Sequence, residues 1–284
     1  MVTPHPEYVS TNLGRLHVRR IGAGPPVVLW HSLFLDSRSW CGLPDRLARE
    51  RTVVVIDGPS HGQSDAFRGD FTFEECVAAA ERILDAHCLA GPVDWVGNAW
   101  GGHVGIQLAL HRPGRVRTLT TIGTPAHPLR PVERWAKAWP LVQLYRVSGP
   151  NRLLFKPLSG ALVGSEAIAA QPELCAEVMS AFTGADRASM FRAARSMMVR
   201  RPDMSADMAR LDVPTLVIAG RDDSTGWRPA DAKRVAATMR NVTVIAATGS
   251  GHSTPLLLDS ATVDQALTEF WNRASQRTDT NCPR

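Results

Sequence analysis

The chain has 284 residues, of which 44% are apolar and 21% are charged, and its formal net charge is +5. This length and apolar content suit one large domain, or one domain that carries an insertion. No run of about 18 apolar residues is present and the first residues lack the apolar stretch of a secretory signal, so we expect neither a membrane-spanning helix nor secretion. The five cysteines show no Cys-x-x-Cys spacing, which argues against a disulfide framework or a zinc site and favours a cytoplasmic protein without metal.

The positive charge is concentrated in one segment. Residues 127–210 contain twelve Lys or Arg and seven Asp or Glu, so this segment alone carries +5. Its longest basic run is Arg200-Arg201, whereas a nucleic-acid-binding chain shows longer basic runs interleaved with aromatic residues. We therefore expect a small-molecule substrate, and neither nucleic acid nor a membrane, as partner. Most of these cations are interpreted as solvated, although one or two arginines could meet an anionic or phenolic substrate. Homodimer formation stays open.

Short apolar runs that alternate with helical stretches predict a mostly parallel sheet. The chain opens with a hairpin around the turn at residues 12–14, and the runs that follow are typical of strands buried on both faces. Alternating strands and helices imply a doubly wound, eight-stranded type of α/β fold with right-handed crossovers. The predicted strands are residues 16–21, 27–30, 53–56, 93–96, 119–122, 215–218 and 242–246, and the predicted helices are residues 38–51, 72–89, 100–111, 229–239 and 262–274.

The alternation stops between the predicted strands 119–122 and 215–218. This stretch is rich in Met, Trp, Ala and Arg, and we interpret residues 125–210 as a helical cap inserted into a core formed by residues 1–124 and 211–284. The last ten residues are expected to fray. The abundance of Met and Trp favours a bulky apolar substrate, such as an aromatic ester or a macrocyclic lactone. The predicted substrate contacts are Ser32, Trp135, Tyr145 and Phe191.

A glycine-flanked turn follows the predicted strand 93–96. Residues 97–101, Gly-Asn-Ala-Trp-Gly, have the spacing Gly-x-Ser-x-Gly, which is a sharp strand-to-helix turn that presents a nucleophilic hydroxyl. Ala99 occupies the serine position, and its methyl group cannot attack a carbonyl. The backbone N–H groups of Leu33 and Trp100 are expected to form an oxyanion hole, which does not depend on side chain 99.

A general base and its acid follow the last two strands. Gly220-Arg221-Asp222-Asp223 comes after strand 215–218, and His252 lies in a glycine-rich loop after strand 242–246. We expect His252 to accept the proton and Asp223 to orient its ring, with Asp222 as the alternative acid. A histidine 29 residues after an acidic strand-end loop is a specific signal, whereas His31 is interpreted as a structural histidine.

Taken together, these residues resemble the α/β-hydrolase family. The order of the motifs along nearly the whole chain is that of the family. These motifs are the His31-Ser32 loop, the loop at residues 57–64, the turn at residues 97–101 (the nucleophile elbow), Asp223 and His252. The resemblance implies a serine-type hydrolase that cleaves an ester or lactone through an acyl-enzyme and needs no cofactor. The His31-Ser32-Leu33 loop is more similar to that of enol-lactonases than to that of carbon–carbon bond hydrolases, which remain an alternative.

Two positions depart from the family's pattern, namely Ala99 in the elbow and Ser60, where glycine is usual in the loop at residues 57–64. Three explanations are open. Ala99 could be an engineered replacement of a parental serine, or the nucleophile could have moved to Ser60, with Ser32 a poorer candidate. In the third, the protein is a non-hydrolytic relative that binds a ligand under its cap, although binding would not require the retained acid and base.

Overall fold

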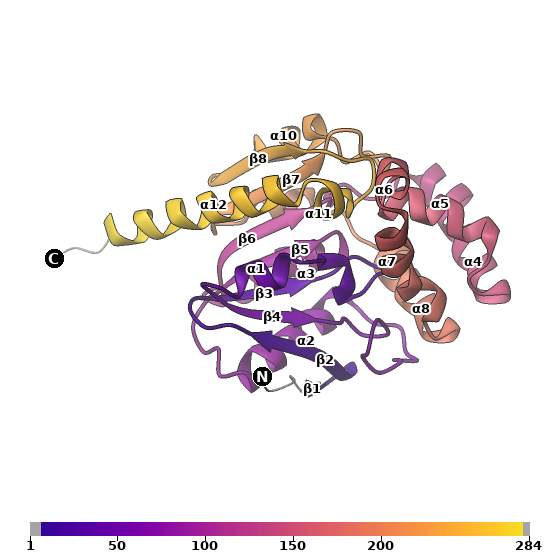
Figure 1. Cartoon of the computed structure of the whole chain (residues 1–284), viewed down its shortest axis with the longest axis horizontal. Helices are drawn as coiled ribbons and strands as arrows, with labels where there is room; N and C mark the ends of the chain where they lie inside the picture. Colours follow the sequence, from indigo (N-terminus) through magenta and orange to yellow (C-terminus); the bar gives the residue numbers. More distant parts are fainter. Residues whose placement is uncertain (1–6, 281–284) are drawn as a thin grey trace.

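The computed structural model describes residues 7–280, and these residues form one eight-stranded sheet in the order β1-β2-β4-β3-β5-β6-β7-β8 (Figure 1). The pairs β1–β2 and β2–β4 are antiparallel, and the other pairs are parallel. The sheet confirms the predicted doubly wound, mostly parallel α/β fold and the opening hairpin. The strands are β1 (Glu7–Thr11), β2 (Gly14–Ile21), β3 (Pro26–Trp30), β4 (Thr52–Ile56), β5 (Val93–Asn98), β6 (Val116–Ile122), β7 (Thr215–Gly220) and β8 (Val242–Ala247).

Helices cover both faces of the sheet because the central strands are apolar on both sides. In β3, Val28 and Trp30 pack into one cluster with α2 and α3, whereas Val27 and Leu29 pack into a second cluster with α1 and α12. The helices of the sheet domain are the short 3-10 helix η1 (Ser37–Trp40), α1 (Leu43–Leu47), α2 (Phe73–Ala86), α3 (Trp100–His111), α10 (Pro229–Ala236), α11 (Thr254–Leu258) and α12 (Ser260–Thr280).

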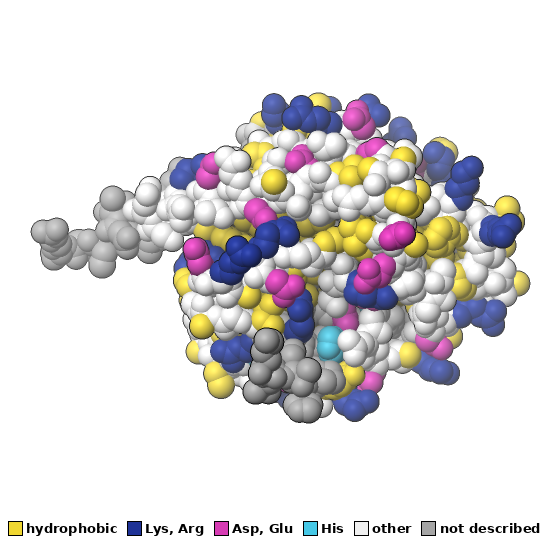
Figure 2. Space-filling view, in the orientation of Figure 1, with side chains coloured by type: hydrophobic (Ala, Val, Ile, Leu, Met, Phe, Trp, Pro, Cys, Tyr) yellow, Lys and Arg dark blue, Asp and Glu magenta, His cyan; other side chains and the backbone are white. Residues whose placement is uncertain are grey.

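Between β6 and β7 the described chain is entirely helical or irregular. We call residues 125–210 the inserted segment, and Figure 1 shows its helices α4–α8 gathered at one end of the sheet. Apolar and basic side chains are mixed on the surface over these helices (Figure 2). The elements are the π-helical turn η2 (Glu133–Ala138), α4 (Trp139–Ser148), α5 (Arg152–Leu162), α6 (Ser165–Ala170), α7 (Pro172–Gly184), α8 (Arg187–Ala194), the π-helical turn η3 (Arg195–Val199) and α9 (Ser205–Ala209).

Two predicted helices differ from the structure. The helix expected over residues 38–51 is divided into η1 and α1, because Cys41 has a φ of 50° and Pro44 starts a new helix. The helix expected to end at residue 274 continues to Thr280, and residues 281–284 of the end expected to fray lie outside the described part. Within residues 7–280, none of the helices combines the length and hydropathy needed to cross a membrane.

Candidate active site

Ala99 lies in a strained turn between β5 and α3. Its φ of 45° and ψ of −101° are unfavourable for a residue with a side chain, and such conformations concentrate at functional sites. The turn is held by a hydrogen bond from the Ala99 N–H to the carbonyl of Ile122, 2.9 Å away. It also needs glycine at position 101, because a Cβ there would lie 1.8 Å from the carbonyl oxygen of Trp30. The geometry of a nucleophile elbow is therefore kept although the serine is absent.

The two residues whose backbone amides are the predicted oxyanion donors, Leu33 and Trp100, line the same cavity as Ala99. Trp100 is the first residue of α3, so its N–H has no acceptor within the helix. The neighbouring amides are used elsewhere, since Phe34 donates to Nε2 of His61 at 3.1 Å and Gly101 donates to the carbonyl of His31 at 3.1 Å. Leu33 and Trp100 remain the predicted oxyanion-hole donors.

His252 and Asp223 meet at the carboxyl ends of β8 and β7. Nδ1 of His252 lies 3.4 Å from Oδ2 of Asp223, while Oδ1 of Asp223 accepts hydrogen bonds from the N–H (2.7 Å) and the hydroxyl of Thr225. Burial alone would raise the pKa of Asp223, but the adjacent imidazole and the Thr225 hydrogen bonds outweigh this effect and lower the pKa. Asp223 is thus an anion that can orient His252 and stabilise its protonated form.

The loop that carries His252 is fastened to the inserted segment. The N–H of His252 donates to the carbonyl of Ala161 at 3.0 Å, and the hydroxyl of Ser250 donates to the carboxylate of Glu166 at 2.6 Å. From the core, the amide of Asn98 donates to the carbonyl of His252 at 2.9 Å. The position of the His252 loop therefore depends on contacts with α5, α6 and β5. These elements are distant from one another in the sequence.

The elbow, the loop at residues 31–34 (the oxyanion loop) and His252 line one cavity of about 190 Å³. Ser32, Leu33, Ala99, Trp100 and His252 all line it. Most of the remaining lining residues belong to the inserted segment. The full remainder is Phe34, His103, Pro125, His127, Leu129, Leu158, Ala161, Leu162, Met197, Met198, Arg201 and Thr225. Among the polar members, sequence reasoning did not single out His103, His127, Arg201 or Thr225.

Ser60 does not line this cavity. Its hydroxyl accepts a hydrogen bond from the N–H of Phe67 at 3.2 Å and lies 3.3 Å from the Phe67 carbonyl, so it closes its own loop. Its φ of 69° explains why glycine would be usual at this position. The geometry therefore gives Ser60 a structural role and does not favour it as a relocated nucleophile.

Three predicted substrate contacts in the inserted segment also lie away from the cavity. Trp135 is 60% exposed and packs against Trp139. Tyr145 is buried against Phe182, and Phe191 is buried with two arginine side chains over its ring. These aromatic residues pack helices of the inserted segment against one another, whereas Ser32, the fourth predicted contact, does line the cavity.

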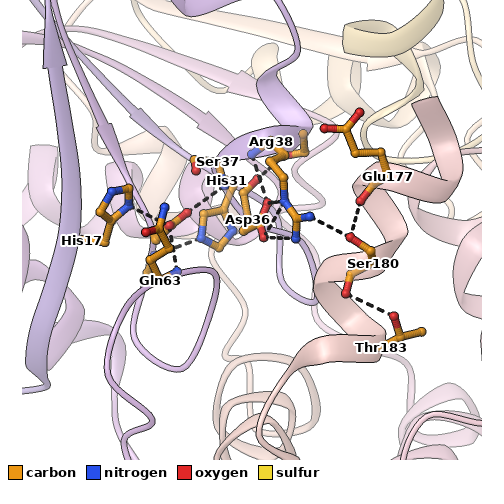
Figure 3. A network of polar contacts seen from close by, with 12 residues as sticks. His17, His31, Asp36, Ser37, Arg38, Gln63, Glu177, Ser180 and Thr183 are labelled. Carbon is orange, nitrogen blue, oxygen red and sulfur yellow. Dashed lines mark hydrogen bonds and ion pairs between the residues drawn. The ribbon is translucent and has the colours of Figure 1, made fainter. Parts of the chain in front are cut away.

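Two buried carboxylates, Asp36 and Asp57, fasten the loops that follow β3 and β4, and Figure 3 shows Asp36 with Arg38 and Ser180. Asp57 accepts hydrogen bonds from Nδ1 of His17 (2.9 Å) and from the N–H groups of Ser37 (2.8 Å) and Gln63 (3.0 Å). Burial tends to raise the pKa of Asp57, yet these donors and the nearby His31 lower it to about 2. Asp36 binds Arg38, which donates to Ser180 of α7 at 2.7 Å and so connects the oxyanion loop to the inserted segment.

The stability of the protein is expected to fall in mild acid because of His61. Burial and the neighbouring His31 lower the pKa of His61 to about 3, whereas an unfolded histidine titrates near 6.5. The unfolded state therefore binds the additional proton, and the free energy of unfolding falls by about 1.4 kcal/mol per pH unit from this group as the pH drops from about 6.5 towards 3. Urea unfolding at pH 7, 6 and 5 measures how the free energy of unfolding depends on pH. In His61→Gln the slope of this dependence should be smaller by about 1.4 kcal/mol per pH unit, which corresponds to one proton. A slope unchanged in His61→Gln would contradict the assignment.

Comparison with known proteins agrees with the fold. Residues 27–266 match the model of the Alpha/beta hydrolase family. The chain belongs to this family. It is 30% identical to the 2-hydroxy-6-oxo-2,4-heptadienoate hydrolase of Pseudomonas putida, with 76% of this chain and 81% of that protein covered. It is also 28% identical to a segment of the polyketide synthase ThaQ of Burkholderia thailandensis, of which it spans only 11% while 84% of this chain is covered.

Solved structures share the fold at low sequence identity. The enol-lactonase from Burkholderia xenovorans superposes with a TM-score of 0.83 at 21% identity, covering 94% of this chain and all of that chain. Within residues 7–280, no three His, Cys, Asp or Glu side chains are grouped so that they could hold a metal ion.

Proposed function

We propose that this chain hydrolyses small esters or lactones, with His252 as the general base and Asp223 as the group that orients it. The observation that carries the proposal is the shared cavity, in which the elbow at Ala99, the amides of Leu33 and Trp100, and the Asp223-paired His252 come together. Preorganised amides next to a general base are the elements that acyl transfer requires.

Because position 99 has no hydroxyl, His252 of this chain would deprotonate a water molecule. The resulting hydroxide attacks the acyl carbon, and the carbonyl oxygen becomes an oxyanion that the amides of Leu33 and Trp100 stabilise. When the tetrahedral intermediate collapses, the protonated His252 gives its proton to the leaving alkoxide, so that an acid and an alcohol are released. An acyl-enzyme route would need a serine at position 99, which is the parental residue in the knock-out explanation.

The cavity favours a small substrate. Its volume of about 190 Å³ lies below the ~300–1,000 Å³ that is usual for sites of drug-sized ligands. A macrocyclic lactone is therefore not the substrate that we propose. A carbon–carbon bond hydrolase is the second candidate, since the relative that is 30% identical to this chain is the heptadienoate hydrolase.

Hydrolysis of p-nitrophenyl acetate and dihydrocoumarin by this chain tests the proposal. We expect slow turnover that His252→Gln lowers by about 100-fold, which is the low end of the contribution of a general base. The Ser60 hydroxyl is bound to Phe67 away from the cavity, so Ser60→Ala should stay within about twofold of the starting chain. Loss of turnover in Ser60→Ala would instead establish the relocated nucleophile, and a folded chain that is inert on both substrates would favour the non-hydrolytic, ligand-binding alternative.

A further inference from the structure

Arg201 is a buried cation that lines the cavity without a carboxylate partner. Arg201 follows η3 in the chain and is 6% exposed, and it lines the cavity. Arg201 takes part in none of the ion pairs found in the described part of the chain, whereas its neighbour Arg200 is well exposed and pairs with Asp70 at 3.0 Å. A buried charge without a counter-ion is strongly unfavourable, so a compensating group is expected.

The protein satisfies only part of this guanidinium. Nη1 of Arg201 donates to the carbonyl of Pro125 and lies 2.9 Å from Nε2 of His103. Nε and Nη2 have no hydrogen-bond partner among residues 7–280. Two N–H-bearing nitrogens of a planar group therefore remain for a ligand.

The surrounding titratable groups do not neutralise Arg201. Burial and the adjacent guanidinium lower the pKa of His103 well below its usual value, so that His103 is neutral. Arg134 repels Arg201 and donates to its backbone carbonyl at 3.3 Å, while Asp203 is exposed and forms no ion pair with it. Asp203 attracts Arg201 only from the exposed surface, so the described chain places no carboxylate against the guanidinium within ion-pair distance.

We propose that Arg201 binds a carboxylate of the ligand that enters this cavity, so that the preferred substrates are small esters or lactones bearing a free carboxylate. That the bound carboxylate belongs to a substrate rests on the proposed function, but carboxylate binding itself does not. A guanidinium presents two parallel N–H groups that match the two oxygens of a carboxylate. The rest of the lining is mostly apolar, which strengthens the ion pair and suits a short hydrocarbon spacer.

Binding of benzoate and of its neutral counterpart benzamide, measured by isothermal titration calorimetry, tests the site without any need for activity. The starting chain should prefer benzoate, and Arg201→Gln should weaken benzoate binding by about 10- to 100-fold, as expected for hydrogen bonds to a charged group, while leaving benzamide binding unchanged. Arg200→Gln is the matched control and should bind benzoate like the starting chain. Equal affinity of the starting chain for both ligands, or an equal loss in Arg200→Gln, overturns the inference.

A conservative variant covers the case in which Arg201→Gln does not fold. Arg201→Lys keeps the charge but loses the two-pronged geometry, so we expect an unchanged unfolding midpoint and benzoate binding that is several-fold weaker. Undiminished benzoate binding in a folded Arg201→Lys or Arg201→Gln variant would count against a direct contact.

Hydrolysis of monomethyl glutarate and methyl pentanoate, followed by acid release, connects the site to catalysis. The ratio of kcat/KM for the two esters should favour monomethyl glutarate and fall at least about tenfold in Arg201→Gln, with methyl pentanoate unaffected. Benzoate binding that depends on Arg201 in a chain that hydrolyses neither ester would overturn the proposed function alone. Hydrolysis with the same ester ratio in both chains would overturn the role of Arg201 alone.

Discussion

Replacing Ala99 by serine is expected to raise the rate of ester hydrolysis by about 100-fold or more. The turn at position 99 already has the strained geometry of an elbow, with a φ of 45°, and the position lines the same cavity as His252. The new hydroxyl would attack the acyl carbon after giving its proton to His252. Because the hydroxyl is held in the elbow, unlike a water molecule, its attack is effectively intramolecular and splits the reaction into two easier steps. Initial rates on p-nitrophenyl acetate, with mass spectrometry to detect an acetylated Ser at position 99, measure both the gain and the change of route.

Two matched variants control this experiment. Ala99→Gly relieves the unfavourable backbone conformation without adding a hydroxyl, so it should not gain activity. Ala99→Ser combined with His252→Gln should lose most of the gain, because the serine would have no base. A folded Ala99→Ser chain that shows neither a faster rate nor an acetylated protein would contradict the assignment of the elbow.

In the Ala99→Ser background, Asp223→Asn is expected to lower kcat by about 10³–10⁴-fold. Asp223 is buried, and its carboxylate lies 3.4 Å from Nδ1 of His252. An asparagine can neither hold the required tautomer of the imidazole nor stabilise its charged form, and the loss of such an orienting carboxylate from a triad has an effect of about this size.

Asp222 supplies the control for the orienting carboxylate. It is the adjacent residue in the chain and is exposed to solvent, and its backbone N–H donates to the carbonyl of Gly249 at 3.1 Å. Asp222→Asn in the same background should keep kcat within about twofold, since the side-chain change leaves this backbone bond in place. A large loss in Asp222→Asn, with Asp223→Asn unaffected, would exchange the two roles.

The elements of the sheet domain could be predicted because their signals are local. Apolar runs such as residues 27–30 and 53–56 are typical of strands that are buried on both faces of a sheet. Glycine is needed at position 101 because α3 starts in close contact with the neighbouring strand β3. The division of the helix expected over residues 38–51 was missed because it depends on the φ of 50° at Cys41, an unusual value for a residue with a side chain.

The fold, the elbow without its nucleophile, and the acid and base after the last two strands could all be predicted from short motifs at strand ends, with Asp222 left as the alternative acid. Which residues of the inserted segment reach the cavity became clear from the packing of its helices. Trp135, Tyr145 and Phe191 are aromatic residues of the kind that line substrate pockets, but they pack between helices or lie exposed. Arg201 belongs to an Arg-Arg pair that suggests a solvated surface, but it is buried beside His103. Whether a side chain faces a ligand, a neighbouring helix or water depends on how helices pack over the sheet, and these contacts join residues that are distant in the chain.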